Sequence, residues 1–113
     1  MLLRRSFIQT EAALTRGGLC LDSNLKTAAF QGKPLEFSMR EFAILEYLMI
    51  HMGRPVSAEE LLEHVWDREA DPFSNQVKVY ISVIRRKLQA VTDEEIIRSI
   101  RGAGYLIDKE EPL

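Results

Sequence analysis

The sequence predicts an α+β fold, in which short N-terminal strands precede three helices and a C-terminal hairpin. Three observations predict it. Short apolar segments separated by turn residues fill the first third of the chain, two serine-led capping motifs follow, and two strand-like runs flank a glycine pair near the end. A chain of 113 residues is expected to form one core. We expect this domain at 13–109, between a linker at 1–12 and a tail at 110–113.

Three segments near the N-terminus have the composition of strands, at 19–21, 27–30 and 35–37. Asp, Ser, Asn, Gly and Pro residues, which favour turns, fill the gaps between them. An earlier strand at 13–15, ahead of a glycine pair, is also possible. Together these segments predict a small antiparallel meander.

Two capping boxes predict the starts of two helices. In each, a serine hydroxyl accepts a hydrogen bond from an orphan backbone N–H, and a glutamate three residues on returns the bond. Ser38 with Glu41 opens a helix at Met39, and Ser57 with Glu60 opens the next. Gly53 and then a proline end the first helix. The apolar stripes are Phe42, Leu45, Leu48, Met49 and Met52 in the first helix and Leu61, Leu62, Val65 and Trp66 in the second.

The segment 74–88 predicts a third helix with two unlike faces, capped by Ser74 or Asn75. At about 100° per residue, four apolar side chains fall in one narrow stripe that must be buried. They are Val77, Ile81, Ile84 and Leu88. The opposite side and its flanks carry amide, hydroxyl, cationic and aliphatic side chains but no acid. These are Asn75, Gln76, Lys78, Val79, Tyr80, Ser82, Val83, Arg85, Arg86 and Lys87.

This outer face suits the major groove of DNA. Lysine and arginine neutralise phosphates, amides and arginine pair with base edges, and an aliphatic side chain can meet the thymine methyl group. Two other interpretations stay open at this point. The face could be a solvated basic surface, or it could bind an acidic protein or a membrane surface, as basic amphipathic helices do.

The overall charge argues mildly against nucleic-acid binding. The formal net charge is −2 and the isoelectric point is about 5.7, whereas DNA-binding domains are often strongly basic. A duplex, however, responds to the charges within roughly 10 Å of Debye screening. Here the acids cluster before and after the third helix, so the surface of that helix is basic although the chain as a whole is not. With acids elsewhere on the chain, we expect nonspecific DNA binding to be weak.

Near the C-terminus, 96–101 and 105–107 read as paired strands. Gly102, Ala103 and Gly104 join them, and such a loop suits a hairpin because glycine tolerates positive φ. Arg101 then lies near the tip. A cation there, beside a basic helix, is a candidate minor-groove probe; the alternative is a solvated arginine.

Little in the sequence points to other classes of protein. The lone Cys20 has no partner for an internal disulfide, and we expect a buried thiol. No apolar run has membrane-spanning length and no signal-peptide core is present, so the expected location is cytoplasmic. His51 and His64 lack ligand spacing, and neither a phosphate loop nor a nucleophile elbow occurs. The sequence predicts no enzyme, no cofactor and no metal site.

With this order of elements, the sequence resembles the winged-helix DNA-binding effector domain of OmpR/PhoB-type response regulators, over about residues 14–107. Four motifs carry the resemblance. They are Phe37-Ser38-x-x-Glu41-Phe42-x-x-Leu45-x-x-Leu48, Pro55-Val56-Ser57 with Leu61-Leu62 and Val65-Trp66, the run from Val77 to Leu88, and Ile100-Arg101-Gly102-Ala103-Gly104-Tyr105.

The resemblance implies a winged helix-turn-helix that reads double-stranded DNA with helix 74–88 in the major groove and the wing, 97–107, in the minor groove. By position, the residues facing the groove are Asn75, Gln76, Lys78, Val79, Tyr80, Ser82, Val83 and Arg86. Arg85 would lie on a phosphate and Arg101 in the minor groove. Trp66 stands where relatives often contact the DNA backbone, although a core role is equally compatible with its position.

The resemblance also implies partners. Relatives bind directly repeated half-sites as head-to-tail homodimers, and they touch RNA polymerase through the loop that here holds Asp67, Arg68, Glu69, Ala70, Asp71, Pro72 and Phe73. That loop could instead be a solvated connector. A receiver domain phosphorylated by a sensor histidine kinase would precede the effector, with 1–12 as its tail and linker. Phosphorylation would raise the dimer population and thereby DNA affinity.

Three positions depart from the family pattern. Many relatives have an acid at Lys78, a histidine at Tyr80 and an arginine or another polar residue at Val83. Val79 and Val83 therefore predict T-rich bases opposite the helix. The apolar pair and the acidic isoelectric point also leave an alternative, a winged-helix protein-interaction module without DNA binding.

Overall fold

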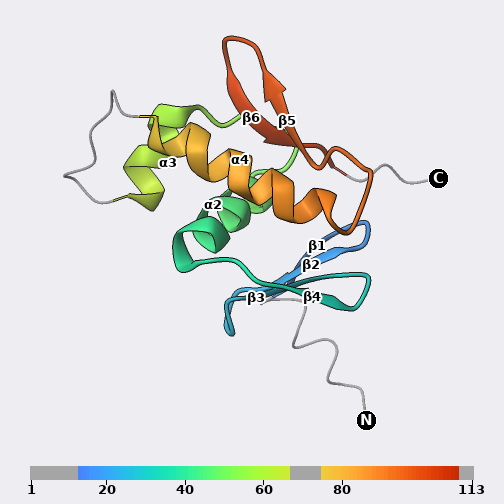
Figure 1. The fold of residues 1–113 in the computed structure, drawn as a ribbon. Coiled ribbons are helices and arrows are strands. Elements are labelled where there is room, and N and C mark those ends of the chain that lie inside the picture. Colours follow the sequence, from blue (N-terminus) through green and yellow to red (C-terminus); the bar gives the residue numbers. More distant parts are fainter. Residues whose placement is uncertain (1–12, 67–74, 110–113) are drawn as a thin grey trace.

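The computed structural model describes residues 13–66 and 75–109 (Figure 1). A four-stranded sheet comes first, three helices follow, and a two-stranded hairpin ends the described chain, so the α+β class is confirmed. The elements are β1 Ala13–Arg16, β2 Leu19–Asp22, β3 Thr27–Phe30, β4 Lys33–Leu35, α2 Met39–Ile50, α3 Ala58–Val65, α4 Gln76–Gln89, β5 Ile97–Ile100 and β6 Gly104–Ile107.

The N-terminal sheet is an antiparallel meander in the order β1-β2-β3-β4, as predicted, and it includes the earlier strand. Its last strand begins two residues before the predicted 35–37. Gln31 and Gly32 both have positive φ, 49° and 84°, and such a two-residue turn places Lys33 directly opposite Phe30. Pro34 is tolerated because β4 is an edge strand, where a missing N–H costs no ladder bond.

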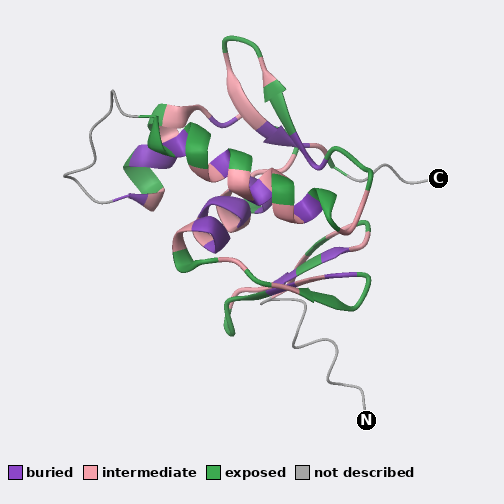
Figure 2. Ribbon diagram, viewed as in Figure 1, coloured by how far each residue is buried: buried purple, intermediate pink, exposed green. Residues whose placement is uncertain are grey.

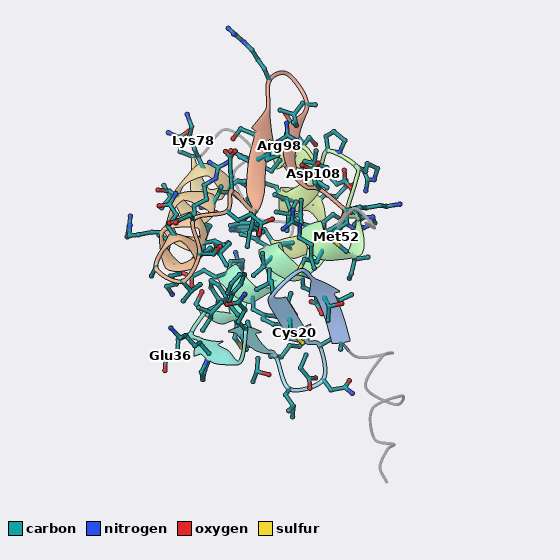
Figure 3. All side chains as sticks on the ribbon, turned by 90° about the vertical axis from the view of Figure 1, so that its right-hand side faces the viewer. Cys20, Glu36, Met52, Lys78, Arg98 and Asp108 are labelled. Atoms are coloured by element: carbon teal, nitrogen blue, oxygen red, sulfur yellow. The ribbon has the colours of Figure 1, made fainter. Side chains whose placement is uncertain are left out.

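The expectation of a buried thiol at Cys20 is wrong, because this side chain is exposed. Successive side chains of a strand point to opposite faces of the sheet. Leu19 and Leu21 are fully buried on the core side of β2, so Cys20 between them must face solvent. Figure 3 shows it on the N-terminal sheet.

The first capping box is complete and the second is half formed. Glu41 N donates to Ser38 Oγ at 3.1 Å, and Ser38 N donates to Glu41 Oε1 at 2.9 Å. At α3, Ser57 Oγ accepts a hydrogen bond from Glu60 N at 3.0 Å. The Glu60 carboxylate binds Tyr47 and Arg54 instead of the Ser57 backbone. Both helices start where predicted, and α2 ends at Ile50, just before the predicted stop.

The core lies between the sheet, the three helices and the base of the hairpin (Figure 2). The predicted stripe of α4 is confirmed: Val77, Ile81, Ile84 and Leu88 are all at most 4% exposed. Burying a side chain of this size is worth roughly 1.5–3 kcal/mol. The buried stripe therefore determines which face of α4 points outward.

The hairpin is joined by backbone bonds to the segment between α2 and α3. Val56 and Tyr105 exchange two N–H···O bonds, each 2.8 Å long, and Gly53 N donates to Ile107 O at 2.9 Å. The loop closes with a bond of 2.9 Å from Ala103 N to Ile100 O. The bonds of Gly53 and Val56 therefore hold β6 to the segment between α2 and α3, while the hairpin turn projects above α4 (Figure 1). No helix within 13–66 or 75–109 is long and apolar enough to cross a membrane.

Candidate nucleic-acid interface

The outer face of α4 collects most of the predicted contact residues. Asn75, Gln76, Lys78, Val79, Ser82 and Arg86 are exposed, and Tyr80, Val83 and Arg85 are partly buried. Val79 is 58% exposed, so its methyl groups are accessible to a ligand. Asn75 occupies the N-cap position but its side chain makes no capping bond, so this amide is not committed to the helix end. Ser74, the other predicted cap, lies outside the described residues.

On the side of α4 nearest the hairpin, a groove runs between the two elements. It is lined by Lys78, Ile81, Ser82, Arg85, Arg86, Gln89, Ser99 and Tyr105. The exposed cations of α4 therefore lie beside the wing. The hairpin side of this groove contributes uncharged side chains, Ser99 and Tyr105.

Arg85 links the two elements across this groove. Its Nε and Nη2 donate to Ile97 O at 3.2 and 3.1 Å, and Nη2 also donates to Ser99 Oγ at 2.8 Å. The guanidinium carbon lies 5.8 Å from the centre of the Tyr105 ring. The sequence places Arg85 on a phosphate, but here it holds the hairpin; a phosphate contact stays a prediction. The helical periodicity around Arg85 does not predict this contact, because its partners Ile97 and Ser99 lie in β5, outside the helix.

The other flank of α4 packs against the start of α2 through Lys87. Its Nζ donates to Glu41 Oε1 at 2.7 Å and to Glu36 O at 2.9 Å. Desolvation by burial would raise the pKa of Glu41, but the hydrogen bond from Lys87, with the Ser38 N–H, outweighs it. The pKa of Glu41 therefore lies below its ordinary value. Lys87 thus forms an intramolecular ion pair with Glu41.

Trp66 ends α3 and is 9% exposed, which fits the core role that the sequence left open. Its ring meets the Tyr80 ring edge-on, with centroids 5.4 Å apart and planes at 78°. The guanidinium carbon of Arg40, in the first turn of α2, lies 4.6 Å from the centre of the Trp66 ring. Contact of Trp66 with DNA stays a prediction. Sequence reasoning missed Arg40, whose place inside the first capping box gives no hint of this contact.

Two arginines of the hairpin differ in their surroundings. Arg101 is exposed in the turn between β5 and β6, at the predicted position. Arg98 Nη1 donates to Asp108 Oδ2 at 2.6 Å, near the base of the hairpin (Figure 3).

The predicted polymerase-contact loop, Asp67 to Phe73, lies outside the described residues.

The two histidines belong to a cluster away from this surface. The rings of His51 and His64 lie 4.5 and 5.4 Å from the Tyr47 ring. Hydrogen bonds from Arg54 and then Tyr47 lower the pKa of Glu60 to about 2. Within 13–66 and 75–109, no three His, Cys, Asp or Glu side chains are grouped to hold a metal ion. The cluster ties α2 to α3.

These features define a winged-helix domain, with a basic outer helix face and a hairpin beside it. Residues 32–107 match the family described as "Transcriptional regulatory protein, C terminal", and the chain belongs to that family. The predicted resemblance to the effector domains of OmpR/PhoB-type response regulators is thereby confirmed.

Relatives with known names are transcriptional and response regulators. The transcriptional regulatory protein CutR of Streptomyces coelicolor is 40% identical over 104 residues, which cover 92% of this chain and 46% of CutR. The two-component response regulator PhoP of Pseudomonas aeruginosa is 36% identical over 105 residues, or 93% and 47% of the two chains. The chain thus spans about half the length of these relatives.

Solved structures with the same fold include two DNA-binding domains. The DNA-binding domain of CpxR from E. coli has a TM-score of 0.77 and 33% identity, covering 88% of this chain and 98% of its own. The Klebsiella pneumoniae RstA domain, solved in complex with the RstA box, has a TM-score of 0.75 and 27% identity, covering 85% and 96%. The winged-helix fold is confirmed by both.

Proposed function

We propose that this chain is the DNA-binding effector part of a two-component response regulator, and that it binds specific double-stranded DNA to regulate transcription. One observation carries the proposal: the exposed face of α4 presents amide, hydroxyl and cationic side chains without an acid, beside an exposed arginine at the hairpin turn. Family membership and the RstA complex with its DNA box support it.

In this proposal, α4 enters the major groove and the hairpin reaches the adjacent minor groove. Lys78 and Arg86 neutralise phosphates or bind guanine edges, and the amide of Asn75, which makes no capping bond, pairs with a base edge. Val79 contacts a thymine methyl group, since an exposed aliphatic side chain suits that contact. Arg101 enters the minor groove, where narrow A·T-rich segments attract arginine.

The remaining partners follow from the family and complete the proposal. This part of the protein has no enzymatic activity of its own and works in the cytoplasm. It binds direct repeats as a head-to-tail homodimer. Residues 67–73 contact RNA polymerase, and 1–12 connect to a receiver domain that a sensor histidine kinase phosphorylates. CutR and PhoP, about twice the length of this chain, leave room for such a receiver.

Selection from a random duplex pool tests the proposal, followed by affinity measurements on the enriched duplex at two salt concentrations. We expect a direct repeat with half-sites about one helical turn apart, T-rich opposite Val79 and Val83, and a steep loss of affinity as salt rises. Uniform G·C pairs at those positions would refute the methyl contacts alone. No enrichment at low salt would refute DNA binding by this chain.

A protein-interaction module is the second candidate, favoured by the acidic isoelectric point of about 5.7 and by Val79 at 58% exposure. Such a module would bind a protein through the same face of α4. Its affinity would depend little on salt, because apolar contacts rather than released counterions would drive it. The salt series therefore separates the two functions.

A further inference from the structure

The cations of α4 other than Lys87 lie on one side of its outer face. Lys78, Arg85 and Arg86 line the groove toward the hairpin, and Arg101 extends that side at the hairpin turn. A helix in the major groove, however, has a phosphate backbone on each side. The flank of α4 away from the hairpin therefore needs a cation of its own.

That second flank carries few charges in α4 itself. Tyr80 and Val83 are uncharged, and the ammonium group of Lys87 is held by Glu41 and the Glu36 carbonyl oxygen, at 2.7 and 2.9 Å. A cation for this flank must come from another element. The first turn of α2 is the neighbouring element, because Glu41 in that turn binds Lys87.

Arg40 lies in that turn, beside α4. Its guanidinium carbon is 4.6 Å from the centre of the Trp66 ring, and the Trp66 ring in turn meets Tyr80 of α4 at 5.4 Å. In the part of the chain that the structure describes, Arg40 makes no ion pair, unlike Arg54 and Arg98. Stacking on an aromatic ring holds a guanidinium in place while its edge N–H groups can bind two oxygens of one phosphate.

We propose that Arg40 binds a DNA backbone phosphate on the flank of α4 opposite the wing, with the Trp66 ring as its support. This inference rests on the proposed function, since it adds a contact to the same interface. It also assigns Trp66 an indirect part: the buried ring positions Arg40. The protein would then hold both backbones of the major groove, one from the wing side and one from α2.

Fluorescence anisotropy with two duplexes of equal length tests this, one recovered by the selection and one of random sequence. We expect Arg40→Gln to weaken binding to both duplexes about 3- to 30-fold at low salt and to make the slope of log K against log salt shallower by about 1, as for one lost phosphate contact. The ratio of the two affinities stays unchanged. Lys33→Gln, an equal charge change on edge strand β4, leaves both quantities unchanged.

Arg40→Lys separates the charge from the stacking. It should retain the salt slope but bind less tightly than the wild type, because lysine does not stack in a plane. Thermal unfolding of each variant checks that the fold persists. An unchanged salt slope in Arg40→Gln would overturn the inference and leave Arg40 as a cover for Trp66, while wild-type binding would still support the proposed function. A wild type that binds neither duplex would overturn both.

Discussion

Arg85 Nη2 of helix α4 donates a hydrogen bond to Ser99 Oγ of strand β5 at 2.8 Å. The same guanidinium also holds Ile97 O. A residue in the second half of the candidate recognition helix therefore bonds that helix to the hairpin. Helix α4 and the hairpin, which are proposed to enter adjacent grooves, are therefore bonded to each other, so the distance between them is fixed before DNA binds.

Arg85→Lys should lower the free energy of unfolding by about 1–2 kcal/mol, because a lysine cannot replace the forked bonds to Ile97 and Ser99. Arg86→Lys is the matched control, since Arg86 is exposed on the next position of the same helix. Urea denaturation measures both. Equal stabilities for the two variants would show that the Arg85 bonds contribute nothing to the fold.

Gly104→Ala should destabilise the protein far more than Gly102→Ala. Both glycines have positive φ, 126° and 79°, but a Cβ on Gly104 would lie 2.1 Å from Val56 O, whereas one on Gly102 meets nothing within 4 Å. Gly102→Ala then costs only the strain of positive φ, roughly 1–2 kcal/mol. Gly104→Ala must in addition break the two backbone hydrogen bonds between Val56 and Tyr105. Thermal unfolding gives the comparison, and similar melting temperatures would contradict it.

Glu60 should make stability depend on acid. Hydrogen bonds from Arg54 and then Tyr47 lower its pKa from 4.5 to about 2 in the folded protein. Because the folded-state pKa is depressed, this contribution is present above pH 4.5 and is lost as the pH falls toward 2. Glu60→Gln should therefore lower stability at pH 7 and flatten its decline in that range.

Unfolding at a series of pH values measures this effect. Glu59→Gln is the control, because it removes an acid from the same turn and leaves Arg54 and Tyr47 with their partner. An acid dependence that is identical in the wild type and Glu60→Gln would rule out the proposed linkage.

Arg101→Ala should weaken binding to the selected duplex by about 1–3 kcal/mol, the scale of one good groove contact. Arg98→Ala should change it far less, because Arg98 already pairs with Asp108 at 2.6 Å and lies away from the tip. Binding titrations at one fixed salt concentration measure both. Unchanged affinity in Arg101→Ala would remove the wing from the interface.

Local chemistry made much of the fold predictable. Ser38 and Glu41 start α2 with a complete capping box, and the periodic stripe from Val77 to Leu88 is buried as its spacing indicates. Capping and amphipathic periodicity involve residues within a few positions of each other, so a sequence window contains the whole interaction. The positions of Arg101 and of the outer face of α4 were predictable for the same reason.

Other features depend on partners far along the chain. Lys87 binds Glu41, which is 46 positions away in the sequence, and Arg85 binds Ser99, which is 14 positions away. No local sequence pattern predicts either pair. Cys20 was misassigned because its small apolar run contains residues for both faces of β2, and only the packing of Leu19 and Leu21 settles which face is inward. The two-residue turn at Gln31 and Gly32 likewise shifted β4.

By itself, the sequence determined the order of elements, the buried and exposed faces of α4 and the resemblance to a family of regulators, because periodicity, caps and turn residues act locally. Only the tertiary structure decided how the cations are divided between the fold and the surface. Arg85 and Lys87 bind groups of the hairpin and of α2, whereas the guanidinium of Arg40 lies over the Trp66 ring. Charge can be counted along a chain, but its availability depends on which distant groups the packing places within reach.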